Sequence, residues 1–405
     1  MDITDLHVLR VTSVFESWGG AAGPGSVRFD PVGGMQTHTG ELTRALDSLG
    51  VTQTVVTTRP PGTPRSTPFG ARATVVHLGL PVPLFRQFYA VPAARLVPRL
   101  AASADLVHAH LGEDIAVMPL ALAAVRRHGL PLVLTVHCSV RYTLAVHDTR
   151  SAVLKFVGGW CERRGEQRAD QVIVLTPRLA GILTAHGVPA DRVRVIPSGV
   201  RPALFAVPGR ADPLAGLPGP RVVFLGRLHE QKNVDLLLRA AARLHHPAHV
   251  VVAGDGPERR RLEELHRRLG LVGRVTFLGF VDHEVVPALL RRADMLVLPS
   301  RYEELGTAMV EAMQSGVPVV ATRTGGIPGV VQDGVSGRLV EPGDVDGLAR
   351  ALDDLLADPG ERRRLGERGR HRTAEFRWDR LAVQVLDVYR SALRERTARA
   401  VAPPQ

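Results

Sequence analysis

The 405-residue sequence is strongly basic but contains almost no lysine. Lysine and arginine total 51 against 40 acidic residues, and Lys155 and Lys232 are the only lysines. Aromatic residues make up only 4% of the chain and do not interleave with the arginines. The stacking platforms that hold single-stranded nucleic acids are therefore missing. We attribute the net charge of +11 to a compositional bias, and no nucleic-acid partner is expected.

Cysteine is equally scarce, with Cys138 and Cys161 the only two in the chain. Two distant cysteines provide neither a disulfide framework nor a CxxC zinc pair. Residues 1–5 are acidic and lack the basic and then apolar pattern of a secretory signal. No apolar run approaches the ~20 residues that span a bilayer, and the longest candidate, 115–125, is followed by two arginines. These absences predict a cytoplasmic protein.

Short apolar runs rich in β-branched residues alternate with helical patterns along the chain. Strands in parallel sheets have this pattern because helices cover both faces of the sheet. The length allows two domains, so the sequence predicts an α/β protein with two doubly wound sheets. Strands are expected at 7–12, 51–57, 74–78, 106–110, 132–137, 172–175 and 193–196, and then at 221–225, 249–253, 274–278, 295–299, 317–321 and 337–340.

We expect the chain to divide near its middle, where residues 201–220 contain five prolines and three glycines. The predicted parts are an N-terminal domain, a linker, a C-terminal domain and a last helix that packs back on the N-terminal domain. Their boundaries are expected at 1–203, 204–220, 221–375 and 376–405. Ligands of doubly wound sheets bind outside the carboxyl ends of the strands. Two such domains facing each other predict a cleft at the linker.

Two motifs in the N-terminal half follow predicted strands. Gly33 and Gly34 lie between the first strand and a helix starting at Met35. A helix N-terminus approached through glycines can bind an anion, although a plain loop-to-helix turn explains the two glycines equally well. His137 ends the strand at 132–137, where it could either reach a ligand or be a buried structural histidine.

Arg227 and Lys232 form the strongest cationic motif, in a segment between a predicted strand and a predicted helix. Two cations at the carboxyl end of a strand suit a diphosphate, although solvated surface residues are the ordinary alternative. Lys232 favours a specific role because the chain uses arginine almost everywhere else. A compact ammonium does not substitute for a planar guanidinium.

Glu303 and Glu311 are separated by seven residues and flank the start of a helix predicted at 307–315. Thr307 is expected to cap this helix through its hydroxyl. Carboxylates accept hydrogen bonds from sugar hydroxyls, and a helix N-terminus can bind phosphate. The pair therefore suits a sugar phosphate, although helix starts also favour glutamate for their own stability.

The histidines and cysteines do not predict a metal site or a nucleophile. His108 and His110 alternate on a strand and would share one face, but the sequence indicates no third ligand for zinc. Cys138 follows His137 directly, and neighbours on a strand face opposite sides of the sheet. A Cys/His nucleophile is therefore disfavoured.

Taken in order, the motifs resemble glycosyltransferase family 4, whose members are retaining enzymes with the GT-B fold of two Rossmann-like domains facing a cleft. The resemblance runs from His7 to about Arg390. The matching segments are Gly33-Gly34-Met35, Thr135-Val136-His137, Gly226-Arg227 with Lys232, Ala253-Gly254-Asp255-Gly256-Pro257, Glu303 with Glu311-Ala312-Met313, Gly316-Val317-Pro318-Val319-Val320-Ala321 and Gly325-Gly326.

The resemblance implies a role for each matching residue. Arg227 and Lys232 would hold the diphosphate of a nucleotide-sugar donor, and Gly33 and Gly34 would close over it from the N-terminal domain. His137 would touch the donor sugar near its 6-hydroxyl and also the acceptor.

The remaining implied contacts also concern the donor. Glu311 would bind the ribose hydroxyls, and the backbone near Phe280 and Val281 would read the base. The sugar and phosphates would contact Glu303 and the backbone of Leu305, Gly306 and Thr307.

The implied reaction is a front-face transfer that retains the anomeric configuration. The sugar becomes oxocarbenium-like as the diphosphate leaves, and a leaving phosphate oxygen takes the acceptor proton. Two cations can stabilise the charge that develops on the diphosphate. Neither a metal nor another cofactor is therefore expected, and the partners are a small-molecule UDP-sugar and its acceptor.

A finer resemblance concerns the acceptor. Residues 29–36, 135–139 and 303–306 are similar to enzymes that attach N-acetylglucosamine or glucose to 2-deoxystreptamine in aminoglycoside antibiotic biosynthesis. Tyr302 and the pair Thr307-Ala308 depart from that group, in which histidine and Gly-Ser are expected.

Two alternatives stay open. A family 4 transferase can act on a lipid-linked or cell-envelope glycan, and residues 85–89 could then anchor the chain at a membrane surface. A nucleotide-sugar epimerase or a phosphorylase can also use two α/β domains, but the Glu303/Glu311 pair with Lys232 favours transfer.

Overall fold

The computed structural model describes residues 6–16, 33–80, 88–112, 114–139, 141, 149–206 and 212–401. The chain forms two compact units. Unit 1 comprises Met1–Pro197 together with Trp378–Gln405, and unit 2 comprises Ser198–Arg377. Residues 29–32 and 85–87 of the motifs discussed above lie outside the described ranges.

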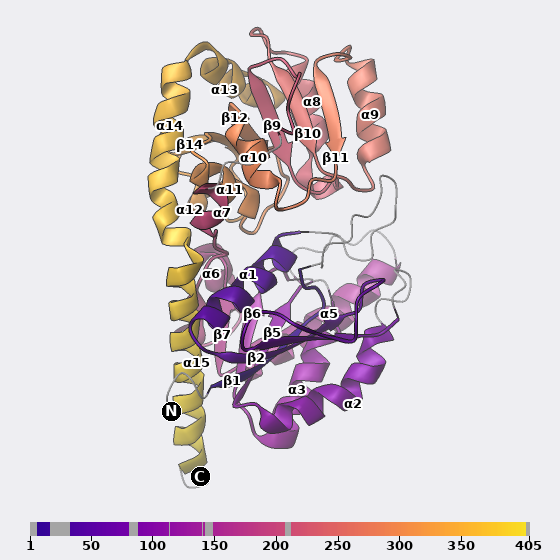
Figure 1. The fold of residues 1–405 in the computed structure, drawn as a ribbon, viewed down its shortest axis with the longest axis vertical. Helices are drawn as coiled ribbons and strands as arrows, with labels where there is room; N and C mark the ends of the chain where they lie inside the picture. The colour runs from indigo at the N-terminus through magenta and orange to yellow at the C-terminus, as the bar shows by residue number, and fades with distance from the viewer. Residues whose placement is uncertain are drawn as a thin grey trace. The chain divides into compact units, whose positions relative to one another are not determined.

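Unit 1 is built on an eight-stranded sheet with the strand order β3-β4-β2-β1-β5-β6-β7-β8 (Figure 1). Every neighbouring pair is parallel except β3 and β4, which are antiparallel. Sequence analysis missed β3, because its three residues, Ser66, Thr67 and Pro68, form no apolar run. The strands are β1 (His7–Thr12), β2 (Thr52–Thr58), β3 (Ser66–Pro68), β4 (Ala73–Leu78), β5 (Leu106–Leu111), β6 (Leu132–Val136), β7 (Gln171–Val174) and β8 (Val193–Val195).

Helices cover both faces of this sheet, as the buried strands require. None of the helices in the described part of the chain combines the length and apolarity needed to cross a membrane. The helices of unit 1 are α1 (Gly34–Ser48), α2 (Ala90–Leu100), α3 (Val117–His128), α5 (Thr149–Arg168), α6 (Pro177–Ala185) and α15 (Trp378–Val401).

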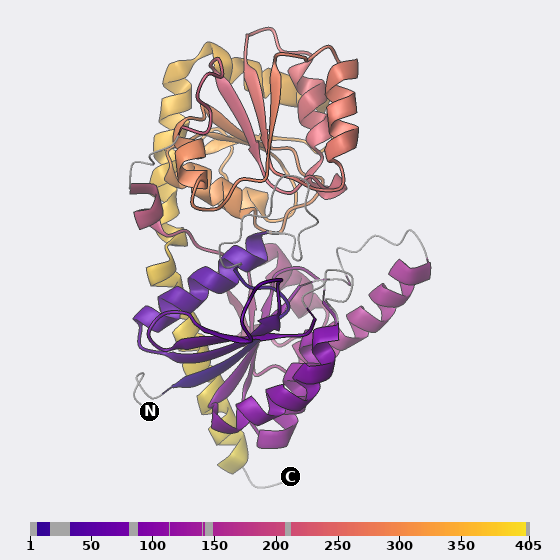
Figure 2. The ribbon, with the colours of Figure 1, turned by 45° about the vertical axis from the view of Figure 1, so that its right-hand side comes forward.

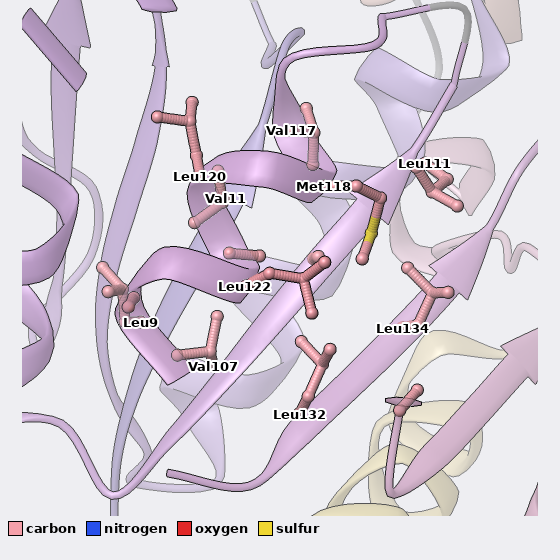
Figure 3. Packing of buried hydrophobic residues seen from close by; sticks show 14 of the residues in the cluster. Leu9, Val11, Val107, Leu111, Val117, Met118, Leu120, Leu122, Leu132 and Leu134 are labelled. Carbon is pink, nitrogen blue, oxygen red and sulfur yellow. The ribbon is translucent and has the colours of Figure 1, made fainter. Parts of the chain in front are cut away.

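Side-chain alternation along the strands gives the sheet two separate cores. Leu9 and Val107 point to one face and belong to the same buried hydrophobic cluster as Met118 of α3, as Figure 3 shows. Their neighbours Val8 and Leu106 point to the opposite face, which α1 and α15 cover. Successive strand residues face opposite sides, so each strand contributes to both cores.

The face beneath α1 and α15 becomes polar toward the carboxyl ends of the central strands. Arg10 on β1 pairs in register with His108 on β5, and Thr12 pairs with His110. Arg10, His108 and His110 follow Val8 and Leu106 at steps of two residues, so they share the same face. All three side chains are fully buried.

Unit 2 contains a six-stranded sheet, entirely parallel, with the order β11-β10-β9-β12-β13-β14 (Figure 2). Its strands are β9 (Arg221–Leu225), β10 (His249–Ala253), β11 (Val275–Gly279), β12 (Met295–Leu298), β13 (Val319–Thr322) and β14 (Gly337–Val340). Its helices are α7 (Pro202–Ala206), α8 (Val234–Ala241), α9 (Arg259–Arg268), α10 (Val286–Arg291), α11 (Thr307–Gln314), α12 (Ile327–Val330), α13 (Val345–Ala357) and α14 (Pro359–Arg372). Both units are therefore α/β, as predicted.

The chain passes from unit 1 to unit 2 after Pro197 and returns before Trp378. The expected boundaries were 203 and 376. Val200 belongs to unit 2 because its N–H donates to the carbonyl of Phe376 at 2.7 Å and its backbone bridges Arg377. On returning, α15 packs against α1, β6 and β7 of unit 1.

Gly254 allows the loops after β9 and β10 to approach each other closely. Gly226 N–H donates to the carbonyl of Ala253 at 3.0 Å, and Leu228 N–H donates to the carbonyl of Asp255 at 2.9 Å. A Cβ on Gly254 would lie 1.8 Å from the carbonyl oxygen of Gly226, and its φ is +150°. The glycine-rich segment after β10 therefore fixes the loop that begins at Gly226.

Replacing Gly254 with alanine should lower the free energy of unfolding by at least about 2 kcal/mol, because backbone atoms cannot move aside as a flexible side chain does. Gly270→Ala is the matched control, since its φ is +68° and nothing lies within 4 Å of its Cβ position. We expect Gly270→Ala to lower the free energy of unfolding by about 1 kcal/mol, because only the backbone conformation is disfavoured there. Denaturant unfolding followed by circular dichroism measures both, and equal losses would contradict the steric argument.

Candidate active site

Two loops of unit 2 meet through Lys232 and Glu303. Lys232 Nζ forms an ion pair with Glu303 Oε2, although 71 residues separate them in sequence. Gln231 Nε2 donates to the carbonyl of Tyr302 at 3.1 Å, and its own carbonyl accepts from Arg301 N–H at 2.8 Å. The structure thus brings together the cationic motif and the first carboxylate of the predicted pair.

Asn233 forms the backbone turn that directly follows Lys232. It is the one described non-glycine residue with a positive φ, 52°, a conformation that asparagine tolerates better than most side chains. Its side-chain amide donates to the carbonyl of Pro299 at 3.2 Å and is buried. The turn is therefore tied to the end of β12, next to the loop that carries Glu303.

The loop from Glu303 to α11 is held by its backbone. Gly326 N–H donates to the carbonyl of Glu303 at 2.9 Å. Gly306, with φ +75°, is the N-cap of α11, and no side chain caps the helix. The prediction that Thr307 caps α11 is wrong, because Gly306 takes the cap position and Thr307 becomes the first helical residue. Leu305 is buried, whereas Gly306 and Thr307 are partly exposed.

Glu311 lies one turn into α11 and contacts a histidine that sequence analysis missed. His283 Nε2 lies 2.9 Å from Glu311 Oε1. His283 follows β11 two residues after Val281, and Phe280 and Val281 are both partly exposed. The one feature of the sequence that points to His283 is its position in the loop that is expected to read the base. In unit 2, the carboxylate of Glu311 is therefore connected to the loop that contains Phe280 and Val281.

Arg227 lies in the loop after β9, with its side chain exposed. Its backbone carbonyl accepts from His229 N–H at 3.0 Å, but among the described residues its guanidinium has no ion-pair or hydrogen-bond partner. The structure consequently leaves one cation of the motif available, while Lys232 is paired with Glu303.

Gly33 and Gly34 form the exposed N-terminus of α1 in unit 1. Gly33 N–H donates to Gln36 Oε1 at 2.7 Å. The amide nitrogen Nε2 of Gln36 is buried and has no hydrogen-bond partner in the described part of the chain. A buried N–H donor beside two exposed glycines suits an acceptor-rich ligand, and the sequence alone did not identify Gln36.

His137 belongs to a buried cluster of histidines on the polar face of unit 1. His110 Nδ1 lies 3.1 Å from His137 Nε2, and the rings of His38 and His137 meet edge to face at 4.4 Å. The rings of His108 and His110 lie 4.2 Å apart with a tilt of 35°, and His108 Nδ1 contacts the Tyr389 hydroxyl at 2.7 Å. His108 and His110 therefore share one face, as predicted.

Burial and a buried cation keep these histidines neutral. Desolvation, together with the nearby Arg10 guanidinium, lowers the pKa of His137 to about 3. Burial also lowers the pKa values of His38, His108 and His110 well below their usual range. The pKa of Arg10 itself falls to about 10 because its guanidinium is desolvated.

The sequence indicated no third metal ligand near His110, and the structure corrects this. Ring nitrogens of His38, His110 and His137 lie within 4.8 Å of one another, close enough by distance alone to hold an ion. The charge of Arg10 opposes such an ion, because its guanidinium contacts His110 Nε2 at 2.9 Å. A divalent cation there would add buried positive charge beside an existing one.

Comparison with known proteins identifies the class. Residues 32–204 match the family described as "Glycosyltransferase Family 4", and residues 210–372 match "Glycosyl transferases group 1". The structure resembles that of sucrose-phosphate synthase from Thermosynechococcus elongatus, with a TM-score of 0.80 and 27% identity over 96% of this chain and all of the other. The fold is therefore GT-B.

Two curated relatives refine the class. A 2-deoxystreptamine glucosyltransferase from Streptomyces kanamyceticus is 33% identical over 80% of this chain and 90% of its own length. A 2-deoxystreptamine N-acetyl-D-glucosaminyltransferase from Streptomyces fradiae is also 33% identical, over 89% of this chain and 90% of its own. The chain belongs to glycosyltransferase family 4, and it is a glycosyltransferase.

The buried histidines should make unit 1 less stable in acid. Unfolding lets them bind protons below their ordinary pKa near 6.5, while the folded His137 resists protonation until about pH 3. The unfolded state therefore binds more protons, and the free energy of unfolding should fall by about 1.4 kcal/mol per pH unit for each histidine across that window.

Tryptophan fluorescence can measure this, because Trp18, Trp160 and Trp378 all fall within unit 1. Urea titrations between pH 7 and 4 give the slope. His137→Asn should reduce the slope by up to one proton, whereas the exposed His186→Asn should leave it nearly unchanged. An unchanged slope in His137→Asn would show that His137 is not protected from protons.

Proposed function

We propose that this protein is a retaining glycosyltransferase that moves glucose or N-acetylglucosamine from a UDP-sugar to a small aminocyclitol such as 2-deoxystreptamine. The observation that carries the proposal is the contact between Lys232 and Glu303 in unit 2. It joins a cation suited to a diphosphate and a carboxylate suited to sugar hydroxyls. No disulfide bond joins Cys138 and Cys161, which accords with action in the cytoplasm.

The ion pair suggests how the donor would be received. A diphosphate carries more charge than a single carboxylate, so it would draw Lys232 away from Glu303. Glu303 would then accept hydrogen bonds from the sugar. Arg227, exposed in the same segment, would contact the diphosphate as well.

The nucleoside end of the donor would lie at Glu311. Its carboxylate is largely buried and is contacted by His283, which fixes its orientation. A fixed carboxylate can accept hydrogen bonds from two adjacent ribose hydroxyls. The backbone at Phe280 and Val281, two to three residues before His283, would read the base.

Transfer would proceed on the front face of the sugar. The bond from the anomeric carbon to the diphosphate oxygen breaks, and a bond to the acceptor oxygen forms on the same face. The acceptor proton passes to a leaving phosphate oxygen. Arg227 and Lys232 would stabilise the charge that develops on the diphosphate. This arrangement needs no metal.

The acceptor assignment draws on the two curated relatives, whose names give 2-deoxystreptamine as the acceptor and glucose or N-acetylglucosamine as the sugar. The motif differences at Tyr302 and Thr307 bear on this point. The Tyr302 hydroxyl donates to buried Glu304, so this part of the loop has its own hydrogen bond.

One observation favours a membrane-bound acceptor as the second candidate. On α5, Phe156 is 79% exposed and Trp160 is 55% exposed, and the Arg164 guanidinium lies 4.6 Å from the Trp160 ring centre. Exposed aromatic residues with adjacent cations are typical of surfaces that contact lipid headgroups. The predicted anchor is less suitable, because Tyr89 is buried although Phe88 is exposed.

Lys232→Ala should lower turnover about 100-fold or more, equivalent to roughly 3 kcal/mol of lost transition-state stabilisation. Lys155→Ala is the matched control, because Lys155 is the only other lysine and lies in unit 1. Steady-state rates of sugar transfer measure the effect. Near-normal turnover in a folded Lys232→Ala protein would refute the role of the ion pair.

Purified protein should convert UDP-glucose or UDP-N-acetylglucosamine and 2-deoxystreptamine to a glycoside with the donor's α configuration. Mass spectrometry and proton NMR of the product identify the sugar and the anomer. EDTA should leave the rate unchanged. A β product, or EDTA-sensitive activity restored by magnesium, would contradict the mechanism. Transfer only to lipid-linked acceptors in anionic vesicles would favour the second candidate.

A further inference from the structure

A continuous chain of hydrogen bonds runs from β1 to His137 across three neighbouring strands of unit 1. The Arg10 guanidinium contacts His110 Nε2 through both Nε, at 3.2 Å, and Nη2, at 2.9 Å. His110 Nδ1 in turn lies 3.1 Å from His137 Nε2. The ring centres of His110 and His137 are 5.4 Å apart with a small tilt of 26°, as expected for rings that meet edge to edge.

Arg10, where this chain of hydrogen bonds begins, is held in place by further hydrogen bonds. Arg10 Nη1 donates to Thr43 Oγ1 at 2.5 Å and to Gln53 Oε1 at 3.2 Å. These partners come from α1 and β2, so the guanidinium is held from two elements besides its own strand. The side chain is fully buried and cannot turn away to solvent.

Donor and acceptor chemistry fixes the direction of each bond. A guanidinium has only N–H donors, so His110 Nε2 must be an acceptor. A neutral imidazole carries one proton, and His110 must therefore carry it on Nδ1. That N–H donates to His137 Nε2, which leaves the proton of neutral His137 on Nδ1.

We propose that Arg10 and His110 are positioning residues that hold His137 in the Nδ1–H tautomer, so that His137 acts only as a hydrogen-bond donor toward a sugar hydroxyl oxygen. The hydrogen bond from His110 occupies the lone pair at Nε2, so the ring of His137 has no nitrogen available to accept a proton from the substrate. Among the described residues Nδ1 has no hydrogen-bond partner, and His137 is 7% exposed. The inference rests on the proposed function, because the family resemblance behind that function implies that the donor sugar and the acceptor contact His137.

The neighbouring His108 provides a matched comparison. It is as buried as His110 and lies on the same face of the same strand. Its two nitrogens contact the Tyr389 hydroxyl and Thr135 Oγ1, both at 2.7 Å. Neither contact reaches His137, so a change at His108 removes buried hydrogen bonds without interrupting the chain.

The tautomer can be read directly from the whole protein labelled with 15N-histidine. Long-range proton–nitrogen NMR spectra distinguish a protonated ring nitrogen from a bare one, and His137→Asn assigns the His137 signals by their loss. We expect Nδ1 of His137 to be protonated and Nε2 to be bare between pH 5 and 8. A spectrum with the proton on Nε2, or a doubly protonated ring at pH 6, overturns the proposal without any variant.

Variants then test the chain of hydrogen bonds from Arg10 to His137. His110→Leu removes the donor to Nε2, so His137 should populate both tautomers and lower kcat by about 10-fold or more. It should also give the pH–rate profile a new acidic limb, since Nε2 becomes free to take a proton. His110→Asn keeps an amide N–H near the position of Nδ1 and should restore most of the rate. His108→Leu should leave the His137 tautomer unchanged.

The readouts separate this proposal from the proposed function. If the tautomer shifts in His110→Leu while kcat and its pH profile stay unchanged, the positioning role in transfer is wrong. If His110→Leu leaves the tautomer itself unchanged, the chain does not control His137, whatever the enzyme transfers. Loss of all transfer to sugar acceptors by the wild type, with the tautomer as expected, would instead refute the proposed function. Circular dichroism confirms that each variant is folded.

Discussion

Parallel pairing between neighbouring strands is the constraint on which both groups of candidate residues depend. In unit 2, β9 pairs directly with β12, so the loops that follow these strands begin side by side. Lys232 and Glu303 meet for this reason. In unit 1, β1 pairs with β5 and β5 with β6, which aligns Arg10, His110 and His137. Carboxyl ends of parallel strands collect distant residues at one edge of a sheet.

The two groups differ in their electrostatics. In unit 2, Lys232 and Glu303 are partly exposed, whereas Glu311 is buried. Under the proposed function, the Lys232–Glu303 ion pair would open when a charged ligand binds. The residues of unit 1 are buried, and burial together with one guanidinium keeps the histidines neutral. The proposed transfer would use both properties, because the cations would move toward the diphosphate while a fixed donor would hold a sugar hydroxyl.

Most of the fold was predictable because short apolar runs alternate with helical patterns along the sequence. Thirteen predicted strand regions appear in the two sheets within a few residues of their expected ends, because most are short apolar runs, and the central ones are buried on both faces. The failures have local causes. β3 has no apolar run to reveal it, and Thr307 was assigned as a cap although Gly306 occupies that position with φ +75°.

Periodicity and short motifs were enough to predict the fold class, the family and the residue types at the strand ends. Which of those residues touch one another became visible only in the folded chain. His38 and Arg10 carry no local signal, yet His38 on α1 contacts His137 directly and Arg10 on β1 is linked to it through His110. His283 reaches Glu311 across 28 residues. Such contacts depend on strand order and on which face a helix covers, and spacing along the chain does not encode either.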